Sequence, residues 1–499
     1  MNQNNISAAE LFQRVRELLM LPELEPQTRN KMMHDTLILC CHEGVKDTKQ
    51  AFGNLFSQVD YLCKARGIKV ADKIAIQTMR RHSNSQEPLS GEDLKYDARA
   101  LALFISAVFG VDVPHELNVL IPHTPRPYQK GLEINNRRIR CIVKNWDGDF
   151  IRVDIDQDAD EEEYLVQLKD EENHIDHTYL WDILKEGMQL NLLDCQVKQP
   201  IITPRLIVVE PDYLVDISSI ATCFTAFGHH PLLYLLNLMK PRANTQATLL
   251  GNFAGAALDD IINSHGKYQM NETVKTNFRE KALEFCTCPW FDPKKFYTDA
   301  SLQAFNLQQV VDILFPRTAS QAQMTALRGE SLYDRKKAIL EPSFVCEALG
   351  IQGRVDLMTT DCKLLVEQKS GRNMNIETHQ VDPGYHSYQL EPHYVQLLLY
   401  YGVLQHNFKL SNDRVNIRLL YSKYRPQDGL MVVAYYQKLF KEAIQYRNQL
   451  VAASFEIAKE GFEHALNEFT PEVLNVAGTQ DFFYNKYLKP QIEAITNPL

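Results

Sequence analysis

The features that this 499-residue chain lacks exclude several classes of protein. No Gly-x₄-Gly-Lys-(Ser/Thr) sequence occurs, so the chain carries no phosphate loop and no motor of its own. No apolar run approaches the ~20 residues that a membrane span needs, and residues 1–5 are polar and uncharged, unlike the start of a signal peptide. The ten cysteines show no disulfide-framework or zinc-ligand spacing, which favours reduced thiols. We therefore expect a cytoplasmic protein with no membrane partner.

An excess of positive charge is also missing. The net charge is −10, so no global basic field indicates binding to nucleic acid. A local groove can nevertheless be basic while the far surface is acidic, and carboxylates that bind a metal add to the negative count. Hydrophobic residues make up 45% of the chain, which is enough for ordinary cores. The length indicates about two to four domains.

The first two regions differ in their periodicity. Residues 1–125 carry apolar residues at helical spacing, beginning after a plausible cap at Ser7, and predict a helical accessory domain. Its helices are expected at residues 8–20, 34–41, 51–65 and 96–109. Residues 126–205 contain short alternating strands separated by turns such as Asp147-Gly148-Asp149. This pattern predicts a small β-barrel of the oligonucleotide/oligosaccharide-binding (OB) kind.

The remaining residues mix strands with helices. Residues 206–465 are expected to form a third domain, and residues 466–499 a C-terminal extension or linker. The fold class is therefore α+β and multidomain. The third domain should end in a long helix from Tyr435 that carries a basic stripe of Lys438, Lys441 and Arg447.

One stretch, GRVDLMTTDCKLLVEQKSG at residues 353–371, is typical of metal-assisted cleavage of a phosphodiester. Two short strands joined by a polar turn are expected there. Because strand side chains alternate, Glu367 and Lys369 share one face and Gln368 lies on the other, and pairing would bring Asp356 beside Glu367. Two hard oxygen ligands at one point suit Mg²⁺ or Mn²⁺. A lysine beside them can orient a water or stabilise charge that develops on a phosphate.

A helix predicted from Pro392 places Gln396 and Tyr400 on one face, four residues apart. The ordered set of Asp356, Glu367-x-Lys369 and Gln396-x₃-Tyr400 resembles the RecB-like branch of the PD-(D/E)xK nuclease superfamily. More narrowly, residues 130–460 are similar to the nuclease module of the flap nuclease–helicases that process Okazaki fragments. The further matches are Glu210-Pro211-Asp212-Tyr213-Leu214-Val215, Glu341-Pro342, Leu349-Gly350-Ile351-Gln352-Gly353-Arg354-Val355-Asp356 and His393-x-x-Gln396.

This resemblance implies a restriction-endonuclease-like α/β/α core and a role for each matched residue. Asp356 and Glu367 would ligate Mg²⁺ or Mn²⁺ together with Asp259 and the backbone carbonyl of Gln368. Lys369 would position the attacking water, so Asp356, Glu367 and Lys369 form the catalytic set. The residues that would hold the DNA strand are Gln396, Tyr400 and His393. The family joins its nuclease to a helicase, which would lie downstream in the same polypeptide or be a separate protein.

The sequence departs from the family pattern in two places. The frame Gly-x₃-His-x₃-(Glu/Asp) matches Gly251 and Asp259, but Gly255 stands at the histidine position. The family also often carries an iron–sulfur cluster, which needs three cysteines after the Gln-x₃-Tyr helix. No cysteine follows Cys362, so we expect no such cluster.

We therefore expect a metal-dependent DNA nuclease that acts on single strands, ends or flaps, works with a helicase and associates with the nucleoid. The glycine at position 255 keeps open a second hypothesis, in which a degenerate nuclease fold serves as a DNA-binding scaffold for a motor or another factor. A third is an RNA-directed nuclease or decapping-type enzyme with the same fold.

Overall fold

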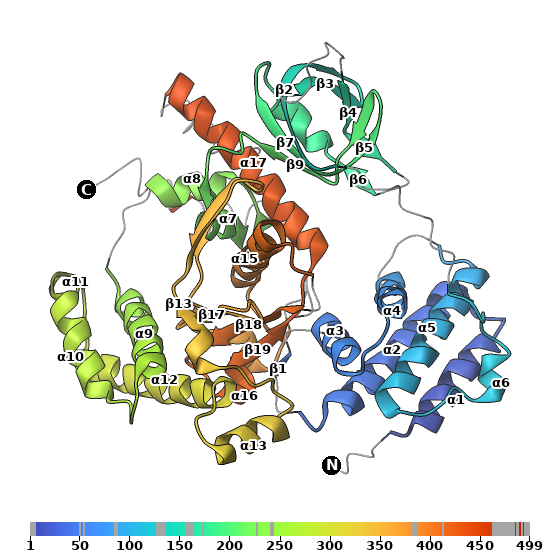
Figure 1. Cartoon of the computed structure of the whole chain (residues 1–499), viewed down its shortest axis with the longest axis horizontal. Coiled ribbons are helices and arrows are strands. Elements are labelled where there is room, and N and C mark those ends of the chain that lie inside the picture. The colour runs from blue at the N-terminus through green and yellow to red at the C-terminus, as the bar shows by residue number, and fades with distance from the viewer. Residues whose placement is uncertain are drawn as a thin grey trace.

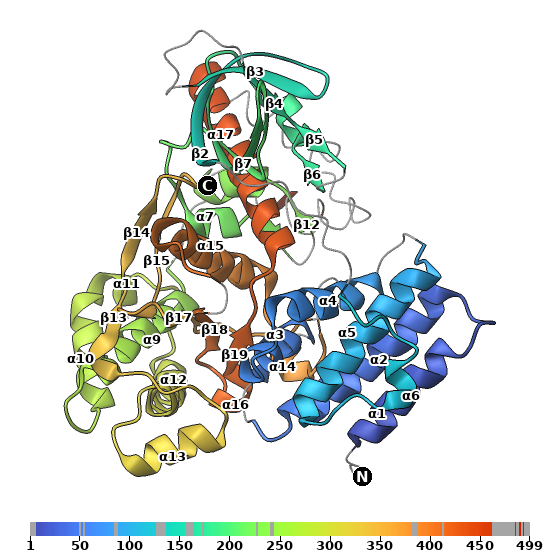
Figure 2. The same cartoon turned by 45° about the vertical axis from the view of Figure 1, so that its right-hand side comes forward.

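The computed structural model describes residues 6–461 except 49–50, 53–54, 84–87, 126–135, 156–163, 172–173, 226–227, 240–243, 382–386 and 412–413, together with 485, 489–490 and 493. Figure 1 shows a helical region in blue, a small barrel in teal and a mixed region from green to red, and Figure 2 shows the same parts after a 45° turn. Most of the predicted extension at 466–499 lies outside the described residues.

The first region is helical, as predicted. Its helices are α1 (Ala8–Leu19), α2 (Pro26–Val45), α3 (Leu55–Ala65), α4 (Val70–His82), α5 (Gly91–Phe109) and α6 (His115–Asn118). Ser7 caps α1 in a capping box with Glu10, which satisfies backbone N–H groups at the helix start. The apolar faces of these helices enclose a core of their own.

The predicted helix at 51–65 is wrong at its beginning. Ala51–Phe52 forms strand β1, which pairs in parallel with residues Met431 and Val432 of strand β19 (Leu430–Val433). Phe52 packs against Tyr61 of α3 with ring centroids 5.2 Å apart. A strand this short has no periodicity to show in the sequence, so only the distant partner strand defines it. The helical region thus adds an edge strand to the sheet of the third region.

The predicted small barrel is present. Its strands are β2 (Asn136–Asp147), β3 (Phe150–Ile155), β4 (Tyr164–Gln167), β7 (Gln189–Lys198) and β8 (Ile201–Thr203), with the small hairpin β5 (Lys169–Asp170) and β6 (Ile175–Asp176) and the 3₁₀ turn η1 (Thr178–Asp182) between β4 and β7. The order is β2-β3-β4-β8-β7, and β7 pairs back onto β2 to close the ring. Strand β9 (Leu206–Val209) extends β7, so the barrel sheet continues past the predicted boundary at residue 205.

The third region is built around a six-stranded sheet in the order β1-β19-β18-β17-β16-β13. Strand β13 (Ala338–Leu340), β16 (Leu357–Thr359) and β17 (Leu364–Lys369) are antiparallel, and β18 (Asn416–Tyr421) lies parallel to β17. A parallel neighbour needs a crossover connection. Helix α15 (Glu391–Phe408) supplies it.

Helices cover both faces of this sheet because alternate strand residues are apolar on both sides. Leu357, Leu364 and Val366 face a core with α9 (Gln246–Asn263) and α12 (Pro293–Leu314). Met358 and Leu365 face a second core with α15, α7 (Ile217–Ala221) and α17 (Gln437–Glu460). The remaining elements are α8 (Leu232–Met239), α10 (Met270–Glu280), α11 (Ala282–Cys286), α13 (Ala319–Leu327), α14 (Met374–Thr378), α16 (Pro426–Gly429), β10 (Val215–Asp216), β11 (Phe224–Thr225), β12 (Gly228–His229), β14 (Ser343–Cys346), β15 (Ile351–Arg354) and the 3₁₀ turn η2 (Arg335–Lys337).

The predicted basic stripe on the last helix is wrong for Arg447. Lys438 is exposed and Lys441 half-buried, but Arg447 is 0% exposed. Its guanidinium donates to the carbonyl oxygens of Tyr213 at 2.6 Å and Glu210 at 3.0 Å. It also donates to the carbonyl oxygen of Gly350 at 3.2 Å. A five-donor guanidinium can satisfy several carbonyls at once, so this residue joins the segment after the barrel to the approach of β15.

Candidate active site

The hairpin of β16 and β17 sets the position of the two predicted carboxylates. Leu357 pairs with Val366 in antiparallel register, which places Asp356 opposite Glu367. The N–H of Gln368 donates to Asp356 Oδ2 at 2.6 Å. Because the N–H and C=O of one strand residue face the same neighbouring strand, the Gln368 carbonyl also faces Asp356. The predicted meeting of Asp356 and Glu367 is confirmed.

The predicted division of β17 into two faces is also confirmed. Lys369 Nζ donates to Glu367 Oε1 at 2.8 Å and to Gln396 Oε1, on α15, at 2.8 Å. The side chain of Gln368 points to the other face, where Nε2 donates to Ser422 Oγ at 2.6 Å. The strand therefore brings Glu367, Lys369 and Gln396 together from positions far apart in the sequence.

The buried carboxylates fit a hard divalent cation. Glu367 is 2% exposed, and its Oε2 has no hydrogen-bond partner among the described residues. Burial, and then the nearby Asp356 carboxylate, raise the pKa of Glu367 to about 8. Burial likewise raises the pKa of Asp356. Two acids that disfavour each other's ionisation, with one oxygen unsatisfied, form a site that a bound cation would stabilise.

Asp259 lies on α9, within electrostatic range of Asp356. Burial, followed by the charges of Glu341, Asp260 and Asp356, raises the pKa of Asp259 to about 6. In the part of the chain that the structure describes, no three His, Cys, Asp or Glu side chains come close enough to form a metal-ligand group. The role of Asp259 as a metal ligand therefore stays a prediction.

A cavity of about 490 Å³ opens beside Lys369 and Gln396. Its wall includes His393 from α15 and Ser218 from α7. The His393 imidazole lies with Nδ1 3.0 Å from the hydroxyl of Tyr421. Burial, and then the charge of Lys369, lower the pKa of His393 to about 3, so the ring is neutral. Both predicted strand-binding residues, Gln396 and His393, thus border the same cavity.

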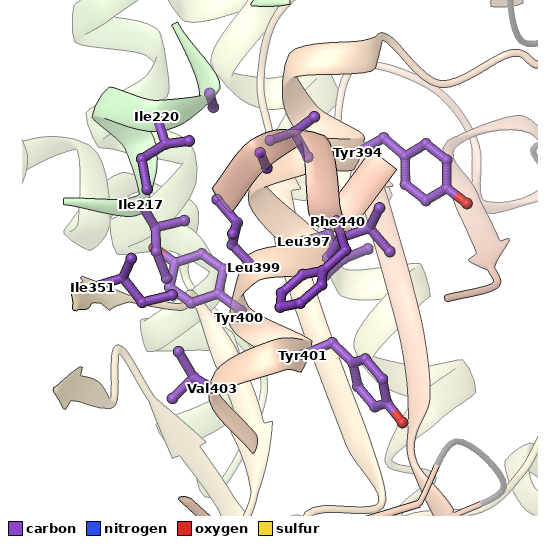
Figure 3. Close-up of a cluster of buried hydrophobic side chains, with 14 of the residues drawn as sticks. Ile217, Ile220, Ile351, Tyr394, Leu397, Leu399, Tyr400, Tyr401, Val403 and Phe440 are labelled. Atoms are coloured by element: carbon purple, nitrogen blue, oxygen red, sulfur yellow. The ribbon is translucent and has the colours of Figure 1, made fainter. Parts of the chain in front are cut away.

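Tyr400 is placed differently from the prediction. Its side chain is 3% exposed, lies outside the residues that line the cavity, and donates its hydroxyl to the carbonyl oxygen of Arg354 at 2.6 Å. Figure 3 shows its ring among apolar side chains, close to Ile217 and Ile351. The ring fits because Gly353 has no Cβ, which would lie 2.9 Å from it. Tyr400 therefore supports the strand that leads to Asp356. Its buried position does not favour direct contact with a DNA strand.

A polar network behind β17 was missed in the sequence. Ser422 Oγ accepts from Gln368 and donates to Gln303 Oε1 at 2.6 Å, and Gln303 Nε2 donates to the carbonyl of Ser370 at 3.1 Å. Gln303 is a buried polar residue inside an apolar helical pattern, which is the one local signal that could have indicated it. The network fixes the end of β17 where Lys369 emerges.

Comparison with known proteins adds no family to this geometry. No protein-family model matches the chain, and no curated protein matches it. Within the described residues, no helix combines the length and the apolarity that crossing a bilayer requires.

Proposed function

We propose that this chain is a metal-dependent nuclease that hydrolyses phosphodiester bonds in single-stranded DNA, including at ends and flaps. The observation that carries the proposal is the convergence of Asp356, Glu367, Lys369 and Gln396, with Glu367 Oε2 buried and unpaired. The helices on both faces of the sheet favour a restriction-endonuclease-like core. The strand order of the barrel, with its β4–β8 pair parallel, favours the OB kind.

In this proposal, Asp356, Glu367 and the Gln368 carbonyl would hold Mg²⁺ or Mn²⁺, with Asp259 beside them. A bound ion of this kind polarises a phosphoryl oxygen and lowers the pKa of water. The Nζ of Lys369 lies between Glu367 and Gln396, and these two bonds leave a third donor position for a water or a phosphate oxygen at the cavity. The neutral His393 can donate or accept one hydrogen bond at the same wall.

The direct test is cleavage of labelled single-stranded DNA in millimolar Mn²⁺ or Mg²⁺. The Lys369→Ala variant should lose at least about 10²-fold in rate, because the donor beside the reacting phosphate is gone. Lys363→Ala, an exposed lysine just before the same strand, should cleave like the wild type. Undiminished cleavage by a folded Lys369→Ala protein would refute the assignment. Matched RNA strands in parallel separate a DNA nuclease from an RNA-directed one.

A second candidate function is a DNA-binding scaffold with a degenerate nuclease fold. The observation that favours it is Gly255, which leaves the face of α9 near Asp259 without the family histidine. Calorimetric titration of the wild type with Mn²⁺ separates the two candidates. Absence of binding heat together with absence of cleavage would favour the scaffold. A helicase partner and association with the nucleoid are proposals that rest on the resemblance alone.

A further inference from the structure

A large cleft lies between the barrel and the third region, and neither Asp356 nor Glu367 lines it. Its volume is about 980 Å³, against about 490 Å³ for the cavity beside Lys369. One wall comes from β2 and the turn before β9, and the other from the C-terminal end of α15 and the first turn of α17. Figure 1 shows the barrel lying against α17 at this junction. We call this hollow the barrel–core cleft.

The walls of the barrel–core cleft are fixed to each other. Asn191 of β7 donates to the carbonyl oxygens of Glu347 at 3.1 Å and Ala348 at 3.2 Å. Leu193 and Leu206, on barrel strands, pack in the same apolar core as the residues under α15. The cleft is thus bounded by elements that pack against each other and are joined by hydrogen bonds, and its charged side chains lie around one opening.

Cations outnumber carboxylates along this cleft. The lysines and arginines are Arg137, Arg138, Arg205, Lys409 and Lys441, and the carboxylates are Asp194 and Glu347. Of these five cations, only Arg138 forms an ion pair with a carboxylate among the described residues. Its partner is Glu347, at 3.9 Å. Burial, and then the charge of Arg205, lower the pKa of Lys441, which indicates how closely the cations are crowded. Such a concentration is unexpected in a chain of net charge −10.

We propose that the barrel–core cleft binds the phosphate backbone of single-stranded DNA at a site separate from the cleavage site. Three of its five cations are arginines, whose planar donors match phosphate oxygens in pairs. Its open shape and its charged side chains suit a charged strand that passes through, rather than a small ligand that must be enclosed. The choice of DNA rests on the proposed function, whereas the binding of phosphate rests on the cleft itself.

Helix α15 connects the two sites. Gln396, near the start of α15, borders the cavity beside Lys369, where cleavage is proposed. Lys409, just after the end of α15, borders the barrel–core cleft. The 13 steps along the chain from Gln396 to Lys409 correspond to about 20 Å at the rise of a helix. A single strand of modest length can therefore contact both sites, and the cleft would add affinity without base-specific contacts.

The test measures binding of a fluorescent oligothymidine in EDTA, where no metal supports cleavage. The cleft variant carries Arg137→Gln, Arg205→Gln and Lys409→Gln, all exposed side chains. The control variant carries Arg14→Gln, Arg16→Gln and Lys31→Gln, equally exposed on the helical region. At about 0.1 M salt, the cleft variant should bind at least about tenfold more weakly, and the slope of log K against log salt should fall by about 2. The control should bind like the wild type.

Equal binding by the wild type and the cleft variant, or equal weakening in the control, would overturn the proposal. If the triple variant unfolds at a lower temperature, the single variants Arg137→Gln and Lys409→Gln should each reduce the slope by about 0.7. Orthophosphate at the same phosphate concentration should not displace the strand, and full displacement would instead indicate a small-anion site. If the nuclease proposal alone fails, the wild type will still bind the oligothymidine through the cleft but will not cleave DNA in Mn²⁺.

Discussion

Gly255 is the position at which the sequence departs from the histidine of the PD-(D/E)xK pattern, beside the proposed metal site. It lies four residues after Gly251 and four before Asp259, so the three share one face of α9. A Cβ built on Gly251 lies 3.2 Å from Ser370 Oγ, just after Lys369, and Asp259 senses the charge of Asp356. A Cβ built on Gly255 meets no atom within 4 Å. The helix therefore has room for a side chain at the position where the PD-(D/E)xK pattern that the sequence resembles has a histidine.

We predict that Gly255→His tightens Mn²⁺ binding at least about tenfold, a gain of about 1.4 kcal/mol. The imidazole would add a nitrogen ligand on the face that already carries Asp259. Isothermal titration calorimetry with Mn²⁺ measures the change. Gly255→Ala is the matched control. It also removes the low helix propensity of glycine, which is worth about 1 kcal/mol, but it adds no metal ligand. Equal affinities in the two variants would contradict the prediction.

Three elements of the third region, β12, α15 and α17, meet at His229. This residue ends β12, and its Nε2 lies 2.6 Å from Glu391 Oε2 of α15, while its Nδ1 lies 2.8 Å from Glu442 Oε1 of α17. Burial lowers the pKa of His229, but the hydrogen bonds and charges of the two glutamates outweigh it and raise the pKa to about 9. The protonated ring therefore ties α15 and α17 together at neutral pH.

The His229 bridge should make stability depend on pH in a defined direction. Because the folded pKa of about 9 exceeds the ordinary value of 6.5, the bridge contributes fully below pH 6.5 and is lost as pH rises through 9. The deficit of His229→Gln should be about 2–3 kcal/mol at pH 6 and shrink above pH 9, as measured by denaturant unfolding. His115→Gln, at an exposed histidine of α6, should show no such trend. A deficit that is constant with pH would rule out the charged bridge.

At the scale of the whole molecule, the three regions are joined by particular polar groups. Arg447 binds the carbonyls of the segment that leaves the barrel, and Asn448 Nδ2 donates to the carbonyl of Ile207 in β9 at 2.8 Å. The N–H of Val209 donates to Asn448 Oδ1 at 3.0 Å. On the other side, β1 continues the central sheet and covers the edge of β19, which would otherwise offer unpaired backbone groups.

We predict that Arg447→Met lowers the free energy of unfolding by about 3 kcal/mol or more. The methionine fills a similar space but removes the guanidinium donor of the Tyr213 carbonyl and one of two donors from the carbonyls of Glu210 and Gly350, which keep the N–H groups of Tyr213 and Val215. Arg447→Lys should not rescue it, because one ammonium cannot reach acceptors spread around a planar fork. Denaturant unfolding measures the loss. Lys438→Met, an exposed neighbour on α17, should stay within about 0.5 kcal/mol of the wild type, and a similarly small effect at Arg447 would disprove its linking role.

Local patterns were sufficient for the hairpin and for the class of each region. The alternation of β17 predicted that Glu367 and Lys369 share a face, and the polar turn predicted that Asp356 returns beside Glu367, because both depend only on neighbouring residues. The helical spacing of residues 1–125 and the short strands of the barrel were readable for the same reason.

The remaining assignments depended on partners far away in the sequence. Spacing put Tyr400 beside Gln396, but the missing Cβ of Gly353, 47 positions earlier, decided that its ring is buried. A charged residue on a long helix predicts an exposed side chain, yet carbonyls from the barrel exit made burial of Arg447 favourable. The sequence by itself thus determined which side chains share a face, since periodicity is local. Only the tertiary structure decided what each face meets, because burial and hydrogen bonding are set by non-local packing.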